Sequence, residues 1–238
     1  MSGRDLGALQ HTIVRCTKCP RLVQWRERVA DEKVSRFMEW RYWGKPVPSF
    51  GDPNARLLIV GLAPAAHGGN RTGRMFTGDR SGDWLFGTLH KYGFADRPAS
   101  TSRADGLKLL DCYITASARC APPQNKLLPA ELRNCRGYLR EEIRLLRNVG
   151  VVVALGKVAF DTVIGSLREL QMTSLPGRTG FKHGAEYKLN GHQTLIASYH
   201  PSQQNTFTGK LTRAMFGAVF RRARSIITPA HRHNVANL

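Results

Sequence analysis

Four of the five cysteines are spaced in a way that suits metal binding. Cys16 and Cys19 form a Cys-x-x-Cys pair, and 14 residues separate Cys120 from Cys135. Because a short pair lets one turn present two sulfurs, four thiolates could meet at a zinc ion or an iron–sulfur cluster. Four unrelated buried thiols are the alternative, and a redox pair is disfavoured because no βαβ pattern surrounds it. Cys112 lies among the apolar residues of a predicted strand, where a thiol behaves as a small hydrophobe, so we leave it out of the site.

Two loops carry the other residues that could do chemistry, and each loop follows a predicted strand. The first runs from Gly61 to Asp79 and is rich in glycine, and the second begins with His200-Pro201-Ser202. Because ligands of open α/β sheets bind beyond the carboxyl ends of the strands, we expect both loops to border one cleft. The first loop has neither the GxGxxG nor the Walker pattern, so the sequence indicates no nucleotide cofactor.

Strands alternate with helices among the elements that must position these residues. Apolar runs predict strands at residues 56–60, 112–116, 151–155 and 194–199. Helical spacing predicts helices at residues 6–14, 21–37, 83–92, 129–148, 157–167 and 210–227. The Asn190-Gly191 pair predicts a hairpin. This alternation predicts an α/β fold: a single domain with a central, mostly parallel sheet of about four strands, flanked by helices on both faces.

Positive charge is in large excess, with 36 Lys and Arg against 17 Asp and Glu and a formal net charge of +19. This surplus, with a sequence pI of about 10.5, favours a nucleic-acid partner over a generally basic surface or an anionic membrane. Residues 1–10 contain no apolar run, and the longest apolar stretch, residues 57–66, is interrupted by Gly61 and Pro64. We therefore expect a cytoplasmic, nucleoid-associated protein with no membrane partner.

Taken in order, these motifs resemble family 5, or type b, of the uracil-DNA glycosylases, the iron–sulfur branch of that superfamily. The resemblance is carried by Cys16-x-x-Cys19, Gly61-Leu62-Ala63-Pro64 continuing to Phe76-Thr77-Gly78-Asp79, Arg119-Cys120 through Lys126 to Cys135, and His200-Pro201-Ser202. It implies one glycosylase-like domain over residues 1–238, with a core at 16–227 and a flexible tail at 228–238. It also implies a monofunctional DNA-repair hydrolase that removes uracil, and other deaminated bases such as hypoxanthine, to leave an abasic site.

The resemblance also implies roles for individual residues. Cys16, Cys19, Cys120 and Cys135 would hold a structural 4Fe–4S cluster, with zinc as the minority option. Phe76 resembles the aromatic residue that stacks on the extruded base, and a core phenylalanine is the alternative interpretation.

Hydrolysis of an N-glycosidic bond builds positive charge on the sugar and negative charge on the departing base. Asp79 is the acidic residue nearest the core of the first loop, and it could hold water or stabilise the sugar. His200 resembles the histidine that opens the second catalytic motif, and it could donate a hydrogen bond to the leaving base. Asp79 could instead cap a helix beginning near Ser81. Asn125 is similarly divided between a turn former and a pocket group.

Two features depart from the pattern of related families. Leu62 and Ala63 stand where relatives have Asp, Asn or Glu, so the usual water-activating residue is missing. Ala116 stands at the strand position where cluster-binding relatives have the Asn that reads uracil. We therefore expect loose base selection by a pocket that comprises Gly61, Leu62, Ala63, Pro64, Phe76, Ala116 and Asn125.

The target base must leave the helix, and we expect residues 203–209 to act as the wedge that fills the gap. The substrate would be single- or double-stranded DNA bound by a monomer, with contacts at Arg74, Gln203, Gln204, Asn205, Lys210 and Arg213. A non-catalytic cysteine–metal module that binds DNA would also explain the charge, but it leaves the two loops without a role. A redox protein is disfavoured by the charge and by the lack of a dinucleotide fingerprint.

Overall fold

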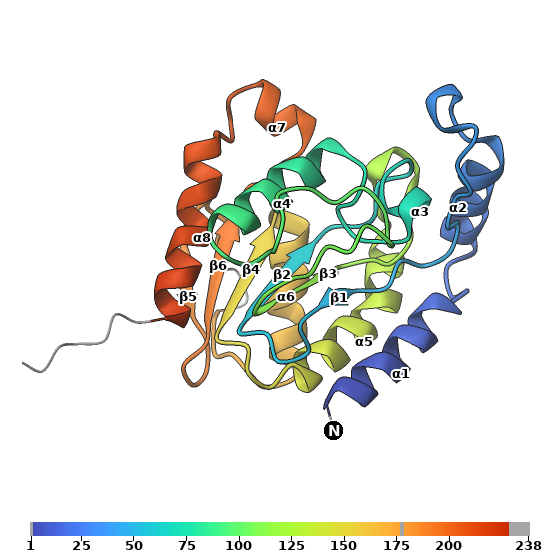
Figure 1. Ribbon diagram of the computed structural model, residues 1–238. Helices are drawn as coiled ribbons and strands as arrows, with labels where there is room; N and C mark the ends of the chain where they lie inside the picture. Colours follow the sequence, from blue (N-terminus) through green and yellow to red (C-terminus); the bar gives the residue numbers. More distant parts are fainter. Residues whose placement is uncertain (1, 177–178, 229–238) are drawn as a thin grey trace, which may run out of the picture.

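Six strands form one mixed sheet at the centre of the molecule, in the order β1-β3-β2-β4-β6-β5 (Figure 1). The computed structural model describes residues 2–176 and 179–228. Four strands run parallel to one another, namely β2 (Leu57–Gly61), β3 (Cys112–Ala116), β4 (Val151–Leu155) and β6 (Thr194–Ser198). Two short strands, β1 (Phe50–Gly51) and β5 (Glu186–Lys188), pair antiparallel at the edges. The predicted α/β fold is confirmed, with two edge strands added to the four expected.

The four parallel strands are buried along their whole length. Runs such as residues 151–155 place apolar side chains on both faces, which is typical of strands covered by helices on each side. In register, Gly61 lies opposite Ala116, and Leu155 lies opposite Ser198. The strands therefore end at a common edge, and the loops that follow them emerge together.

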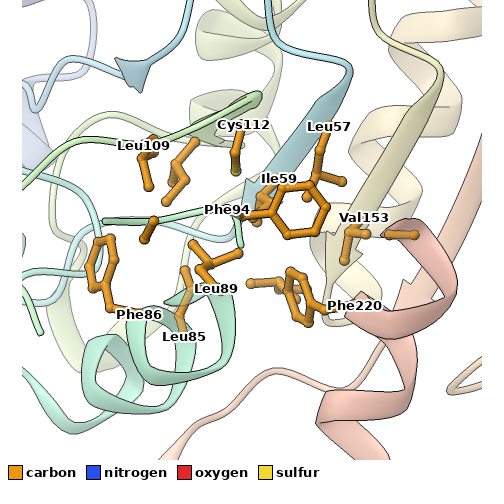
Figure 2. Packing of buried hydrophobic residues seen from close by; sticks show 14 of the residues in the cluster. Leu57, Ile59, Leu85, Phe86, Leu89, Phe94, Leu109, Cys112, Val153 and Phe220 are labelled. Atoms are coloured by element: carbon orange, nitrogen blue, oxygen red, sulfur yellow. The ribbon is translucent and has the colours of Figure 1, made fainter. Parts of the chain in front are cut away.

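One face of the sheet is covered by α4 (Arg80–Lys91) and α8 (Arg213–Ile227), whose apolar residues form a large core with it. Figure 2 shows side chains of this core, including Leu85, Phe86, Leu89, Phe94 and Phe220 around Leu57, Ile59 and Val153 of the strands. Cys112 lies in the same core and is fully buried. The prediction that this thiol packs as a small hydrophobe is confirmed.

The opposite face is covered by α5 (Pro129–Leu145) and α6 (Lys157–Glu169), which form a second core with the sheet. Leu139 and Ile143 come from α5, and Phe160 and Val163 come from α6. The N-terminal helix α1 (Ser2–Val14) packs against α5, and α2 (Pro20–Glu32) follows it (Figure 1). The N-terminal segment is thus attached to the outside of the sheet domain.

Several elements differ from the prediction at their ends. The second helix ends at Glu32 rather than near residue 37, because Lys33 has a left-handed backbone (φ 55°), and η1 (Ser35–Phe37) follows as a separate turn. The last helix starts later than predicted, at Arg213, because the side chain of Thr212 caps it by accepting a hydrogen bond from the amide of Met215. Short helices α3 (Gly69–Thr72) and α7 (Gln203–Phe207) lie within the two predicted loops.

Three further expectations have different outcomes. The hairpin is confirmed, since β5 and β6 pair across a turn in which Gly191 has a φ of 75°. The predicted flexible tail spans residues 228–238, and all of it beyond Thr228 lies outside the described ranges. Within residues 2–176 and 179–228, no helix is both long enough and apolar enough to cross a bilayer.

Candidate active site

A cavity of about 700 Å³ opens where the parallel strands β2, β4 and β6 end. Its walls come from both loops, from the turn before α5 and from the start of α6. The polar and aromatic side chains that line it are Phe76, Asp79, Arg80, Ser81, Gln124, Asn125, Lys126, Lys157, His200, Ser202, Gln203 and Gln204. The expectation that the two loops border one cleft is confirmed.

Phe76 has an unusual backbone, with a φ of 54° that bulky side chains rarely adopt. Its ring packs directly on Gly61, where an added Cβ would lie only 2.7 Å from the ring Cζ. The ring also stacks with the imidazole of His200 at 5.8 Å between centroids and 27° between planes. A strained aromatic residue held against two loops at a cavity wall is a candidate surface for a planar ligand.

Asp79 both caps a helix and lines the cavity, so the two interpretations of this residue are compatible. It is the N-cap of α4, and its Oδ1 accepts a hydrogen bond of 2.9 Å from the amide of Gly82. Its other oxygen faces the Cα of Gly68, where a Cβ would lie 2.3 Å away. Burial raises the pKa of Asp79, while the amides of Gly82 and Ser81 lower it. The cavity thus contains a carboxylate held by fixed backbone donors.

His200 follows β6 directly and lines the cavity across from the first loop. Burial lowers its pKa to about 4, so the imidazole is neutral at neutral pH and carries one N–H donor. The side-chain amide of Asn205 donates to the carbonyl oxygen of His200 at 2.9 Å. That bond ties the start of the second loop to α7 and fixes the direction in which the histidine leaves the sheet.

Asn125 also combines its two predicted roles. It lies in η2 (Pro123–Asn125), where Gln124 and Asn125 both have left-handed backbones (φ 53° and 57°), as turn residues do. The same turn brings Asn125 to the cavity wall. An asparagine side chain offers two N–H donors and a carbonyl acceptor, so it can pair with the polar edge of a base.

The other predicted pocket residues divide into two groups. Leu62 and Ala63 line the cavity as predicted. Gly61 lies beneath the Phe76 ring, Pro64 packs against Gly69, and Ala116 is buried at the end of β3 in the core shared with α4 and α8. The described residues that line the cavity do not include Gly61, Pro64 or Ala116. Side-chain amides reach the cavity from Asn125 and from three glutamines, Gln124, Gln203 and Gln204.

Sequence reasoning missed several cavity residues for which a signal existed. Lys157 and Val158 line the cavity at the start of α6, just after Gly156, which has a φ of 95°. They follow the end of β4, so the rule applied to the ends of β2 and β6 would have found them. Gln124 and Lys126 flank Asn125 and were missed because only the asparagine was considered.

Arg74 corrects one of the predicted DNA contacts. Its side chain is buried, and its guanidinium forms an ion pair of 2.7 Å with Asp105. It also donates to the hydroxyl of Ser100 and to the carbonyl of Arg103. A guanidinium that is buried and paired in this way holds the first loop to residues 100–105, and it is not available to phosphate.

The remaining predicted DNA contacts lie near the second loop. Gln203 and Gln204 are exposed and line the cavity, whereas Asn205 is half-buried and bound to His200. Lys210 and Arg213 are exposed beyond α7, and each lies over an aromatic ring, that of Tyr199 and of Trp84 respectively. Positive charge therefore flanks the cavity on the α8 side.

The four predicted ligand cysteines gather at one place, which we call the cysteine corner. Cys16 follows α1, Cys19 is the N-cap of α2, Cys120 follows β3 and Cys135 lies in α5. The pKa of Cys120 is raised to about 12, mainly by burial and in part by the neighbouring thiols of Cys135 and Cys16, while the Arg26 guanidinium lowers it. Burial also raises the pKa of Cys135, and Cys19 and Cys16 act in the same direction. The four thiols are thus close enough to interact electrostatically.

Hydrogen-bond donors surround the sulfurs of the cysteine corner. The buried guanidinium of Arg26 donates from Nη1 to Cys120 Sγ at 3.1 Å, and Asn134 donates to Cys19 Sγ at 3.4 Å. Ile13, Ala118 and Tyr138 pack around Cys135. All five cysteines are free thiols. Across the described part of the chain, no three His, Cys, Asp or Glu side chains are arranged to hold a single metal ion.

Comparisons with known proteins agree on one family. A family model described as the Uracil DNA glycosylase superfamily matches residues 48–224. The chain is 48% identical over 222 residues to the Type-5 uracil-DNA glycosylase of Thermus thermophilus, covering 93% of this chain and 98% of that protein. It is 49% identical over 212 residues to the Type-5 uracil-DNA glycosylase of Mycobacterium leprae, covering 89% and 91%. A Type-4 uracil-DNA glycosylase of Archaeoglobus fulgidus is 30% identical over 157 residues, covering 66% and 70%.

Proposed function

The chain belongs to the uracil-DNA glycosylase superfamily, and from this premise we propose that it is a monofunctional DNA-repair glycosylase. It hydrolyses the N-glycosidic bond of uracil in DNA and leaves an abasic site. The observation that carries the assignment is the cavity at the ends of the strands. Asp79, Asn125 and His200 line this cavity together with Phe76, which stacks on His200. A module that only bound DNA would not need such a cavity.

Asp79 supports the sugar side of the reaction. Leu62 and Ala63 have no group that can activate water, so the carboxylate of Asp79 is the negative charge available from the first loop. Positive charge develops on the sugar as the bond breaks, and a fixed carboxylate stabilises it without reorganisation. The backbone donors at Ser81 and Gly82 hold the carboxylate in place and favour its ionised form.

His200 supports the base side of the reaction. Because its pKa is lowered to about 4, it is a neutral imidazole that donates one hydrogen bond. A departing uracil carries negative charge on its oxygens, and a donor at that position stabilises the charge as it develops. The stacking of the imidazole on Phe76 places the donor next to the ring on which the base would lie.

Phe76 and Asn125 select the base. The Phe76 ring provides a stacking surface, and the side-chain amide of Asn125 pairs with the polar edge of the flipped base. The cavity volume lies in the usual range for small-molecule sites, and the small side chain of Ala63 is part of its wall. We propose on this basis that hypoxanthine and xanthine are accepted besides uracil.

The second loop contacts the DNA from which the base is removed. Phe207 ends α7 with 63% of its surface exposed, and the guanidinium of Arg80 lies 4.3 Å from its ring centroid. An exposed aromatic residue beside the cavity can fill the gap left by an extruded base. Lys210 and Arg213 supply positive charge to the phosphates. A single chain contributes the whole cavity, so we propose a monomer acting on DNA in the cytoplasm, at the nucleoid.

The cysteine corner fits a structural 4Fe–4S cluster, which we propose is bound by Cys16, Cys19, Cys120 and Cys135. Four thiols interact there, and the Arg26 guanidinium already donates to one sulfur, as groups around cluster thiolates do. A 4Fe–4S cube spaces its thiolates more widely than a single metal ion does. When bound, the cluster supplies cross-links rather than reaction chemistry, and these residues tie α1 and α2 to β3 and α5.

One assay tests the proposed function. The protein is incubated with oligonucleotides that carry a single uracil, hypoxanthine, xanthine or mismatched thymine, and abasic products are cleaved with alkali. We expect cleavage at uracil and at the deaminated purines, and none in a matched strand with a thymine–adenine pair at the same position. Binding of the uracil strand without any cleavage would favour a non-catalytic DNA-binding module instead.

A further inference from the structure

Arg71 is a buried cation inside the first loop that the proposed mechanism does not use. It lies in α3, and only 3% of its surface is exposed. The ion pairs among the described residues do not include it. Its Nη1 is buried without a hydrogen-bond partner in that part of the chain. Burying a charged group without an ion pair costs free energy, so we expect Arg71 to have a role that offsets this cost.

The guanidinium spans the loop and joins its two arms. Its Nε donates to the carbonyl oxygen of His67 at 2.7 Å, and its Nη2 donates to the carbonyl oxygen of Gly78 at 3.1 Å. Gly78 has a φ of 77°, and a Cβ there would lie 2.3 Å from Arg71 Nη2. The glycine is therefore required both by its backbone conformation and by the approach of the guanidinium.

Two aromatic rings hold the guanidinium from the side of the N-terminal segment. The ring centroids of Phe37 and Trp40 lie 3.8 Å and 4.1 Å from Arg71 Cζ. The rings are inclined to each other at 73°, so they form a corner around the cation. Cation–π contacts of this kind replace part of the solvation that Arg71 loses on burial.

The two carbonyls that Arg71 binds belong to residues that directly precede Asp79 and the glycine against which its carboxylate rests. Gly78 precedes Asp79 itself. His67 precedes Gly68, whose Cα faces Asp79 Oδ2 so closely that a Cβ there would lie 2.3 Å from it. One planar fork thus fixes the backbone that carries the carboxylate and the backbone against which the carboxylate rests.

We propose that Arg71 is a positioning residue for base excision: braced by Phe37 and Trp40, it holds the Asp79 carboxylate in its working geometry by tying the carbonyls of His67 and Gly78 together. This inference rests on the role proposed for Asp79. A lysine would keep the charge but could not make the two directed bonds, because only arginine presents a rigid, planar set of donors.

Arg71 also acts on the charge of Asp79. Burial raises the pKa of Asp79 most strongly, and Asp83, on α4 itself, raises it further. The amides of Gly82 and Ser81 lower it, and so does the Arg71 cation from α3. Loss of the cation therefore shifts the pKa of Asp79 upward. Since the reaction needs the ionised carboxylate, the acid limb of the pH–rate profile moves to higher pH when Arg71 is neutralised.

The test compares Arg71→Gln and Arg71→Lys with a matched control, Arg103→Gln. Arg103 is an exposed arginine that lies over the Trp43 ring, so the control removes a cation next to the same loop without breaking a bond to its carbonyls. Single-turnover rates on uracil duplex, dissociation constants for that duplex, melting temperatures and pH–rate profiles are measured for each full-length variant.

We expect Arg71→Gln to lower the single-turnover rate by roughly ten- to a hundredfold, the range caused by small misplacements of a reacting group. Its dissociation constant should stay within about twofold of wild type, because the residue does not touch DNA in this account. The acid limb should move to higher pH in Arg71→Gln and stay in place in Arg71→Lys, which should still be slow. Arg103→Gln should match wild type in rate and profile.

Wild-type rates in both Arg71 variants would overturn the proposal. A parallel loss of rate, DNA affinity and melting temperature in both would overturn it as well, because it would indicate general unfolding. If Arg71→Gln does not fold, the Arg71→Lys variant tests the proposal alone. Its single-turnover rate must fall while the acid limb of its pH–rate profile stays in place. An Asp79→Asn variant in the same series keeps the two assignments apart: if it has the wild-type rate, the role of Asp79 has failed and the Arg71 proposal fails with it, whereas a slow Asp79→Asn beside wild-type rates in both Arg71 variants overturns the Arg71 proposal alone.

Discussion

The cavity and the cysteine corner lie next to each other in the fold, but their reactive side chains have different surroundings. Cys120 belongs to the cysteine corner, and residues 124–126, a few positions along the same segment, line the cavity. Ala63 lines the cavity and packs against the apolar residues around Cys135, so the two regions are in contact.

The difference lies in what surrounds the reactive atoms. Cys120 and Cys135 are buried, Cys16 and Cys19 are half-buried, and the thiols interact with one another. In the cavity, Asp79 and His200 are only partly buried, and Asn125 is exposed. Groups that face each other inside an apolar cluster suit a permanent link, whereas groups that face open space suit a ligand. We therefore expect changes in the cysteine corner to affect folding, and changes in the cavity to affect chemistry at constant stability.

The largest effect should follow from substitutions in the cysteine corner. Cys120→Ser and Cys135→Ser should each lose the cluster and most of the folded protein, because a lost ligand releases the link between the N-terminal segment and the sheet. Iron content, visible absorbance and melting temperature measure this. The wild type should be brown, with about four irons per chain.

Cys112→Ala is the matched control, because Cys112 lies in the core between the sheet and α4 and has no part in the cysteine corner. It should keep both the colour and the iron. Equal loss of iron in Cys112→Ala would mean that the wrong four cysteines were assigned. A colourless wild-type protein that contains zinc would contradict the proposed iron–sulfur cluster.

The next effect concerns the base side of the cavity. His200→Ala should lower the excision rate by roughly ten- to a hundredfold, because a positioned donor to the leaving base is lost. The loss should differ among uracil, hypoxanthine and xanthine, since a donor matters most for the base that leaves least readily. Single-turnover rates on the three substrates measure it. His192→Ala, at an exposed histidine of the β5–β6 turn, is the control and should change none of them. An equal loss on all three bases would contradict the assignment to the leaving group.

The smallest effect should come from the exposed aromatic residue of α7. Phe207→Ala should slow excision from duplex DNA by roughly fivefold, the effect of one weak base–aromatic contact. Single-stranded substrate should be affected less, because no gap in a helix needs filling. Phe207→Trp, which keeps an aromatic face, should restore the duplex rate. Equal losses on both substrates would show that α7 does not act as the wedge.

The sheet and its buried strands could be predicted from the sequence because their signals are local. A run such as residues 151–155 has no polar residue, and this pattern already requires cover on both faces. The common edge of the sheet could also be predicted, because each of the two loops follows a predicted strand. This placed Asp79 and His200 in one cleft. Residues that follow a strand were therefore the predictable part of the site.

What could not be predicted depends on contacts between distant parts of the chain. Arg74 resembles any other basic residue in the sequence, and only its ion pair with Asp105, 31 positions later, removes it from the DNA surface. Ala116 ends β3 and Asn125 follows it, and the left-handed turn at Asn125 brings that residue, rather than Ala116, to the cavity. The burial of Arg71 likewise depends on Phe37 and Trp40, which lie beyond a helix end that the periodicity did not reveal.

The most direct measurement is the single-turnover rate of uracil excision by Asp79→Asn, taken together with its melting temperature. Asparagine caps helices as well as aspartate does, so α4 should keep its N-cap and the melting temperature should match wild type. The negative charge is lost, and the rate should fall by about a hundredfold or more, the usual effect of removing one fixed group that stabilises transition-state charge. A wild-type rate in a folded Asp79→Asn protein would contradict the account of the cavity.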